Sequence, residues 1–188
     1  AIAASLKLER LWANLLMSKT LGEIQPVTSK YPIRTFIPDF DNQQFLSLNN
    51  KVFANYPDQG GWSMDDLKFR QNENWFDKEG FFVAEDMGEL IGFCWTKIHG
   101  TYAHSHNDSD DDHGHEALGE IYVLAVHPGY KRKGVGRDLT FTGLNYLKYK
   151  GLNKVMLYVG VENKPAFNLY KSLGFIEFGS DVMYRIKS

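Results

Sequence analysis

The most informative stretch of this 188-residue chain reads Leu124-Ala125-Val126-His127-Pro128-Gly129-Tyr130-Lys131-Arg132-Lys133-Gly134-Val135-Gly136-Arg137. It begins as an apolar strand that ends at Pro128, and a basic turn then leads directly into a helix. The first N–H groups of a helix have no acceptor within it, and the helix dipole adds positive potential there, so an anion is favoured. Gly134 and Gly136 let an anion approach the backbone. The positive charge of the turn comes from Lys131, Arg132, Lys133 and Arg137.

This turn matches neither of two better known phosphate-binding loops. No Gly-Lys-Ser or Gly-Lys-Thr follows it, as a P-loop requires, and the third glycine of the dinucleotide-binding fingerprint is missing. By itself, a Gly-x-Gly at a helix start is also typical of a plain strand-to-helix turn with solvated lysine and arginine side chains. The function of the turn therefore has to be inferred together with the rest of the sequence.

Around this turn, hydrophobic periodicity predicts a mixed sheet with helices packed on it. Strands are expected over residues 33–37, 80–85, 90–98, 119–126, 154–159, 175–178 and 181–186. Helices are expected over residues 42–54, from Ser63 onward, over 134–150 and over 163–173. Ser63 and Asp66 have the spacing of a capping box, and Gly174 ends the last helix.

The N-terminal part of the chain has a helical pattern of its own. Apolar side chains that recur at helical spacing predict a helix over residues 5–18, and they are Leu8, Leu11, Trp12, Leu15 and Leu16. Gly22, Pro26 and Pro32 then break the pattern and predict a linker. We expect residues 1–31 to form this helix and linker, and residues 32–188 to form the main domain.

Composition excludes several classes of protein. The 21 basic and 23 acidic residues give a net charge of −2, so no global basic field would attract nucleic acid. No apolar run approaches the roughly 18 residues of a membrane span, and no signal peptide is recognisable. The one cysteine, Cys94, cannot form a disulfide framework, which favours a reducing compartment and a cytoplasmic location. We expect Cys94 to be buried in its strand and not to act as a nucleophile.

Residues 100–116 are rich in histidine and aspartate and contain almost nothing apolar. Such a composition predicts a solvated loop. Its histidines are His104, His106, His113 and His115. No spacing among them resembles a structural zinc site, so we expect no required metal here.

A second segment follows the turn after one further helix and strand, and it reads Asn163-Lys164-Pro165-Ala166-Phe167-Asn168-Leu169-Tyr170-Lys171-Ser172-Leu173-Gly174-Phe175. Together the two segments resemble the GNAT superfamily of N-acetyltransferases. The patterns of that superfamily are Gln/Arg-x-x-Gly-x-Gly/Ala after a strand and then Asn-x-x-Ala-x-x-x-Tyr-x-x-x-Gly-Phe. Lys131 stands where Gln or Arg is usual, a small departure because the backbone supplies most of the binding.

This resemblance covers about half of the chain. It implies the acyl-CoA N-acyltransferase fold, of class α/β (α+β), with a mixed and mostly antiparallel sheet of about seven strands and flanking helices. It also implies acetyl-CoA as the co-substrate, without a metal.

Further phrases resemble the C-terminal repeat of a GNAT branch that is built from tandem acetyltransferase repeats. They lie at residues 55–62, 75–77, 92–99, 119–123, 157–159 and 181–185. That branch acetylates the cysteinyl amine of cysteinyl-glucosaminyl-inositol. The resemblance implies either that residues 1 to about 26 are the tail of an upstream repeat or that the chain is a single-repeat relative.

The same resemblance implies roles for individual residues. Glu120 would take the proton of the amine and Tyr170 would protonate the leaving thiolate. Backbone N–H groups would bind the acetyl carbonyl where the strand separates from its neighbour, at Leu124, Ala125 and Val126. The other expected contacts to the cofactor are Lys131, Arg132, Lys133, Gly134, Val135, Gly136, Arg137, Asn163 and Asn168. The expected contacts to the acceptor are Asp58, Lys97, Glu120 and Tyr158.

Each of these roles has a plainer alternative. Glu120 can be a surface carboxylate at a strand end, Tyr170 a core aromatic, and Asn163 a helix cap. Asp58 replaces the Glu that is usual in that branch, so its reach is shorter by one methylene.

Three functions remain open from the sequence. The first is an acetyl-CoA-dependent N-acetyltransferase acting on cysteinyl-glucosaminyl-inositol, and the second is an acetyltransferase of protein N-termini or small amines. The third is a non-catalytic acyl-CoA-binding domain. We expect a small-molecule amine substrate as partner, no nucleic acid or membrane, and a monomer or weak homodimer.

Overall fold

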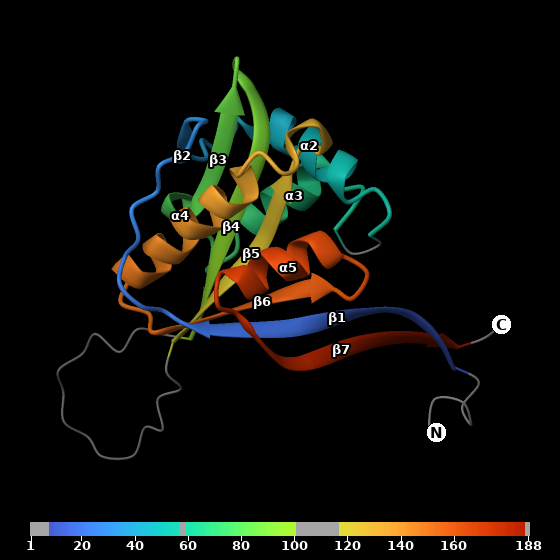
Figure 1. The fold of residues 1–188 in the computed structure, drawn as a ribbon. Coiled ribbons are helices and arrows are strands. Elements are labelled where there is room, and N and C mark those ends of the chain that lie inside the picture. The colour runs from blue at the N-terminus through green and yellow to red at the C-terminus, as the bar shows by residue number, and fades with distance from the viewer. Residues whose placement is uncertain (1–7, 57–58, 101–116, 187–188) are drawn as a thin grey trace, which may run out of the picture.

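A computed structural model describes residues 8–56, 59–100 and 117–186, which form one seven-stranded sheet with helices on both faces (Figure 1). The order of strands across the sheet is β2-β3-β4-β5-β6-β1-β7. The strands are β1 (Leu8–Thr20), β2 (Ile33–Thr35), β3 (Phe81–Asp86), β4 (Glu89–His99), β5 (Leu118–Val126), β6 (Lys154–Gly160) and β7 (Ile176–Ile186). The helices are α2 (Asn42–Val52), α3 (Met64–Gln71), α4 (Val135–Tyr149) and α5 (Lys164–Ser172), with short 3-10 turns η1 (Lys78–Gly80) and η2 (Pro128–Tyr130).

The pairing of the strands confirms the mixed and mostly antiparallel sheet expected from the sequence. Every neighbouring pair is antiparallel except β5 and β6, which run parallel. A parallel pair needs a crossover connection, and α4 provides it. The helix therefore carries the chain from the end of β5 back to the start of β6.

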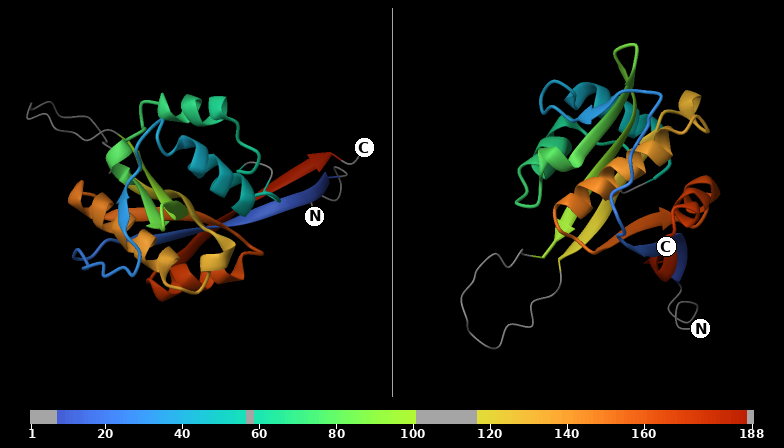
Figure 2. Two further views of the ribbon diagram at one scale, coloured as in Figure 1. Left: turned by 90° about the horizontal axis from the view of Figure 1, so that it is seen from above. Right: turned by 60° about the vertical axis from the view of Figure 1, so that its left-hand side comes forward.

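Helices cover the sheet in two layers. The left view of Figure 2 shows α2 and α3 on one face and α4 and α5 on the other. The core on the α2–α3 side is aromatic, and its largest buried members are Phe36, Phe45, Trp62, Phe81, Phe93 and Trp95. The core on the α4–α5 side is mainly aliphatic and includes Met17, Ile91, Leu139, Leu147 and Leu157. Burial of these side chains on both faces is the main stabilising contribution to the fold.

Close contact between α4 and the sheet depends on Gly143. A Cβ atom at this position would lie 2.9 Å from the Cys94 sulfur and 3.1 Å from a methyl carbon of Ile121, closer than packed atoms tolerate. Cys94 itself is fully buried, as expected, and burial raises the pKa of its thiol to about 12. The thiol is therefore protonated at neutral pH and unsuited to act as a nucleophile.

Two further local predictions are confirmed. Ser63 caps α3, where its hydroxyl accepts the N–H of Asp66 and the Asp66 carboxylate accepts the N–H of Ser63 at 2.8 Å. The hairpin of β3 and β4 turns at Met87 and Gly88, both of which have positive φ.

The helix expected over residues 5–18 is wrong, because residues 8–20 form strand β1 between β6 and β7. Leu15 and Met17 lie opposite Val159 and Leu157 of β6 and pack into the aliphatic core. A strand with neighbours on both edges and partly covered faces carries apolar side chains on both sides, so its pattern resembles a helical stripe. Pairing with β6 and β7, which the periodicity of the sequence does not indicate, makes this segment a strand.

The two strands expected over residues 175–178 and 181–186 are one strand, β7. Gly179 and Ser180 do not end the strand, because they pair with Leu16 and Leu15 of β1. The register of β7 against β1 shifts by one residue at Phe178, which forms a β-bulge, since Met17 pairs with Glu177 while Leu16 pairs with Gly179. The expected number of strands is correct only because this error offsets the missed strand β1.

Among the described residues, no helix is both long enough and apolar enough to span a bilayer.

A buried ion pair joins the two ends of the segment that leads into α2. Asp41 is fully buried and accepts two hydrogen bonds from the Arg34 guanidinium, at 2.6 and 2.8 Å, and one from the N–H of Ile37 at 2.7 Å. Burial by itself would raise the pKa of Asp41, but the hydrogen bonds from Arg34 and Ile37 outweigh it and lower the pKa. Glu85 of β3 holds the other side of Arg34 at 2.5 Å.

Replacing Asp41 by Asn should lower the free energy of unfolding by about 3 kcal/mol at pH 7, because it leaves the partly buried Arg34 charge with only the more exposed Glu85 as an ionised partner. The contribution of a carboxylate with a lowered pKa is complete above its unfolded pKa, near 4, and is lost as the pH falls through the folded pKa. Urea denaturation at pH 7 and pH 3 checks this. Glu85→Gln is the control, with a smaller expected loss because Glu85 is only partly buried. An equal loss for Asp41→Asn at both pH values would contradict the interpretation.

Candidate functional site

The sheet opens between β5 and β6. These strands pair only over Gly119–Ile121 and Val155–Leu157, whereas β5 stays paired with β4 as far as Val126. Beyond Ile121, the edge of β5 that faces β6 has no partner strand among the described residues. The separation expected around Leu124, Ala125 and Val126 is therefore present, and it leaves backbone groups able to bind a ligand.

A β-bulge in β5 lies at the start of this opening. Trp95 of β4 pairs with Val123 while Thr96 pairs with Ile121, so Tyr122 is an extra residue. Ile121 packs toward α4, whereas both Tyr122 and Val123 pack into the aromatic core on the other face. The bulge thus shifts the alternation of side chains along β5. Glu120 lies on the α2–α3 face, and Leu124 and Val126 lie on the α4–α5 face.

Glu120 is a buried carboxylate with one partner. Its residue is 6% exposed, and its Oε2 lies 2.6 Å from Nε2 of His99. His99 was not among the residues selected from the sequence. It lies two residues after Lys97 on β4 and so on the same face of the sheet. Only the register of β4 against β5, which the sequence does not give, places it beside Glu120.

Lys97 lies directly opposite Glu120 in the register but does not form an ion pair with it. Its ammonium nitrogen lies instead 4.3 Å from the ring centre of Trp75 and 5.5 Å from that of Tyr122. Both rings pack against Trp95, whose Nε1 is fully buried and has no partner among the described residues. A cation held on an aromatic surface therefore shares the face of the sheet on which the carboxylate lies.

Tyr170 lies on α5, on the opposite face of the sheet from Glu120. It is buried beside Phe175, and burial together with the nearby Cys94 raises its pKa well above the ordinary value. Tyr170 is thus protonated at neutral pH and can donate a proton. Its hydroxyl has no hydrogen-bond partner among the described residues.

The position of α5 brings this helix to the opening. A Cβ atom at Gly136, in the first turn of α4, would lie 3.4 Å from Val126 and 3.5 Å from Leu169 of α5. The end of β5, the start of α4 and the middle of α5 therefore meet around Gly136. Figure 1 shows α5 running beside β6.

The turn between β5 and α4 has the geometry of an anion cradle. Arg132 and Gly134 have positive φ, of 62° and 89°, so the backbone adopts the left-handed conformation at two positions before the helix. The first helical bond runs from the N–H of Asp138 to the oxygen of Gly134. The preceding helical N–H groups, of Val135, Gly136 and Arg137, have no backbone acceptor among the described residues. Successive free N–H groups of this kind bind phosphate.

The basic side chains of the cradle are exposed. Lys133 lies over the ring of Tyr130 and Arg137 over that of Phe141, at 4.6 and 5.4 Å. Val135 is 1% exposed, so only its backbone is available to a ligand. Lys131 and Arg132 extend into solvent.

The remaining predicted site residues differ in where they lie and in how far they are exposed. Asn163 caps α5 by accepting the N–H of Ala166 at 3.2 Å, which is the plainer of its two expected roles, and Asn168 is exposed on the same helix. Tyr158 of β6 is 47% exposed and lies two residues after Met156, the partner of Glu120 in the register, so it shares the face of Glu120. Asp58 and most of the histidine-rich segment 100–116 lie outside the described residues.

Tyr56 is a neighbour of the site that is not among the site residues predicted from the sequence. Its ring atoms lie 3.5 Å from where a Cβ atom of Gly160 would stand, at the end of β6. The loop after α2 therefore reaches across to β6 on the side of the opening where Tyr158 lies.

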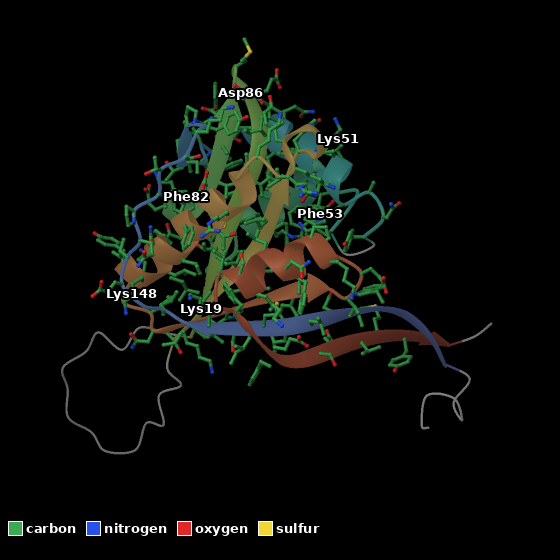
Figure 3. All side chains as sticks on the ribbon, viewed as in Figure 1. Lys19, Lys51, Phe53, Phe82, Asp86 and Lys148 are labelled. Atoms are coloured by element: carbon green, nitrogen blue, oxygen red, sulfur yellow. The ribbon has the colours of Figure 1, made fainter. Side chains whose placement is uncertain are left out.

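A separate cavity of about 440 Å³ lies between α2, the tip of the β3–β4 hairpin and η2. Figure 3 labels Lys51 and Asp86, which border it from two sides. Lys51 contacts His127 at 2.8 Å, just before the cradle. Of the residues expected to bind the acceptor, the three that the structure describes, Lys97, Glu120 and Tyr158, do not line this cavity. In the part of the chain that the structure describes, no group of histidine, cysteine and acidic residues is arranged to hold a metal ion.

Comparison with known proteins agrees with the geometry. Residues 45–175 match the model of the acetyltransferase (GNAT) family. The chain is 46% identical over 187 residues to a mycothiol acetyltransferase of Acidothermus cellulolyticus, covering 98% of this chain and 57% of that protein. It is 43% identical to a mycothiol acetyltransferase of Thermobifida fusca, covering 98% of this chain and 60% of that protein. The chain thus spans little more than half the length of these curated relatives.

Solved structures share the fold at low sequence identity. A GCN5-related N-acetyltransferase from Sphaerobacter thermophilus is 18% identical with a TM-score of 0.72, covering 97% of this chain and 54% of that one. A chain of the NatC complex bound to Gag peptide and CoA is 19% identical with a TM-score of 0.61, covering 83% of this chain and 96% of that one. At these identities the likeness concerns the fold.

Gly134→Ala should weaken CoA binding about tenfold or more, because a side chain at positive φ distorts the cradle. Gly151, at the other end of α4, has a φ of 86° and nothing within 4 Å of an added Cβ atom, so Gly151→Ala is a matched control. Both variants should lose about 1 kcal/mol of unfolding free energy. Calorimetric titration with CoA should separate them. Equal affinities for CoA would show that the cradle does not bind the cofactor.

Proposed function

Since the chain belongs to the acetyltransferase (GNAT) family, we propose that it transfers the acetyl group of acetyl-CoA to the cysteinyl amine of cysteinyl-glucosaminyl-inositol. The observation that carries the proposal is the opening between β5 and β6, with a carboxylate, Glu120, on one face and a protonated tyrosine, Tyr170, on the other. The names of the relatives support the choice of acceptor.

Acetyl-CoA would bind along the open edge of β5. Its pyrophosphate would accept hydrogen bonds from the free N–H groups of Val135, Gly136 and Arg137, with exposed Lys131 and Arg132 adding charge. The peptide-like pantetheine arm would continue the sheet in the manner of an added strand. The thioester carbonyl would then face the backbone N–H groups near the bulge, which stabilise the oxyanion of the tetrahedral intermediate.

The reaction needs two proton transfers. Glu120 would accept a proton from the substrate ammonium group, and the freed amine would attack the thioester carbon. As the tetrahedral intermediate collapses, the C–S bond breaks and Tyr170 would donate its proton to the departing sulfur. Burial raises the pKa of Tyr170, and it also makes a thiolate in the same place more basic. The thiolate therefore remains basic enough to take the proton from the tyrosine hydroxyl.

The acceptor would approach from the α2–α3 face. Lys97 and Tyr158 lie on that face with Glu120, and we retain Asp58 as a further contact. Hydroxyl groups of a sugar and an inositol suit a lysine ammonium and a tyrosine hydroxyl as hydrogen-bonding partners. The rings of Trp75 and Tyr122 hold Lys97 in place.

We further expect a monomer or a weak homodimer in a reducing, cytoplasmic environment, for which the buried free thiol of Cys94 is suited. A protein N-terminal or small-amine acetyltransferase is the second candidate, because the NatC complex, one chain of which shares this fold, is bound to Gag peptide and CoA. A non-catalytic acyl-CoA-binding domain is the third.

Turnover on cysteinyl-glucosaminyl-inositol, read as CoA thiol released, tests the proposal against a panel of peptides and small amines. We expect the inositol compound to be acetylated at a kcat/KM at least a hundredfold above any peptide in the panel. Preferential turnover on a peptide would replace the acceptor by a protein N-terminus. Binding of acetyl-CoA without any turnover would contradict catalysis by this chain.

Tyr170→Phe should lower kcat about a hundredfold or more and leave the affinity for acetyl-CoA unchanged, because it removes only the proton donor. Steady-state kinetics and calorimetry together check this. Tyr31→Phe is the matched control, since Tyr31 is also a buried tyrosine of the same core cluster. Parallel losses of acetyl-CoA affinity and kcat in the Tyr170 variant would indicate a packing role instead.

A further inference from the structure

The orientation of Glu120 is fixed by a residue on the neighbouring strand. Oε2 of Glu120 lies 2.6 Å from Nε2 of His99, a short distance for a nitrogen–oxygen pair. The Glu120 side chain is 8% exposed and that of His99 is 37% exposed. Among the described residues, Glu120 has no other side-chain hydrogen bond or ion pair, and its Oε1 is unpaired.

The acid–base state of this contact follows from the carboxylate. An ionised carboxylate only accepts hydrogen bonds, so a close nitrogen must donate to it. Nε2 of His99 therefore carries a proton when Glu120 is ionised. Because a buried carboxylate without any donor is costly, loss of this bond would turn Glu120 toward other donors or toward water.

The chain contains a stronger cation at the same face but holds it away. Lys97 lies directly opposite Glu120 in the register, yet its ammonium group lies over the rings of Trp75 and Tyr122. A permanent positive charge against the carboxylate would stabilise its ionised form and weaken it as a base. Histidine supplies a hydrogen-bond donor without a permanent charge, so it can orient the carboxylate without an obligatory ion pair.

We propose that His99 is a positioning residue, which donates its Nε2–H to Oε2 of Glu120 and thereby directs Oε1 toward the acceptor amine. This inference rests on the proposed function, in which Glu120 is the base. In the step concerned, an N–H bond of the substrate ammonium breaks and an O–H bond forms at Oε1, while Oε2 keeps its hydrogen bond from His99. The proton leaves Oε1 to solvent once the product has departed.

Two substitutions of His99 separate positioning from packing. In His99→Gln the amide nitrogen reaches about as far as Nε2 and can donate to Oε2, whereas His99→Leu keeps apolar bulk without a donor. We expect His99→Leu to lower kcat about tenfold to a hundredfold with little change in KM for acetyl-CoA, because the base is misoriented. His99→Gln should stay within about threefold of the original kcat. The reverse order, with Leu active and Gln impaired, would overturn the proposal.

A double substitution tests whether His99 acts through Glu120. Glu120→Gln removes the base, so adding His99→Leu to it should lower kcat by less than about twofold further. Thermal unfolding of all the variants controls for loss of fold. Independent, multiplying effects of the two substitutions would contradict a role through Glu120.

A spectroscopic measurement tests the contact without relying on turnover. Long-range ¹H–¹⁵N spectra of the intact chain at pH 8 show which nitrogen of His99 is protonated, and we expect the proton on Nε2. A bare Nε2 would overturn the inference even if acetyl transfer is observed. Absence of turnover on every amine, with Nε2 protonated, would instead contradict the proposed function and leave the contact established.

Discussion

The parting of β5 from β6 is the constraint on which the rest of the site depends. The two strands pair over three residues and then separate, while β5 stays paired with β4 as far as its end at Val126. Unpaired backbone groups on the open edge are unfavourable in a dry interior, so they have to be satisfied by water or by a ligand. The start of α4 and the middle of α5 close around the same opening at Gly136. A sheet that continued its pairing would leave no place for a peptide-like arm.

The bulge at Tyr122 determines which side chains face which side of that opening. Without the extra residue, Glu120 and Leu124 would share one face of β5. With it, Glu120 lies with Lys97 and His99 on the α2–α3 face, and Leu124 lies on the face of Tyr170. In the proposed reaction this separates the approach of the acceptor from the departure of the thiol, so the two proton transfers need not compete for one space.

The two cores suit this division. On one side, the stacked and edge-on rings of Phe81, Trp95 and their neighbours form a rigid wall behind Lys97 and Tyr122. On the other side, α4 packs so closely on the sheet that no side chain would fit at position 143, where the residue is glycine. This close packing brings the N-terminus of α4 to the end of β5. The aromatic core thus positions the residues around Lys97 and Tyr122, and the close packing of α4 positions the anion cradle.

The local units could be predicted from the sequence: the turn into α4, the cap at Ser63, the hairpin of β3 and β4, and the motif around Tyr170. Such units depend on neighbours in the chain, whose chemistry is visible as spacing. Four features could not be predicted in this way: residues 8–20 form a strand, β7 is continuous, β5 has a bulge, and His99 contacts Glu120. Each of these follows from the register between strands far apart in sequence. That register is set by packing of the whole sheet, and no local pattern encodes it.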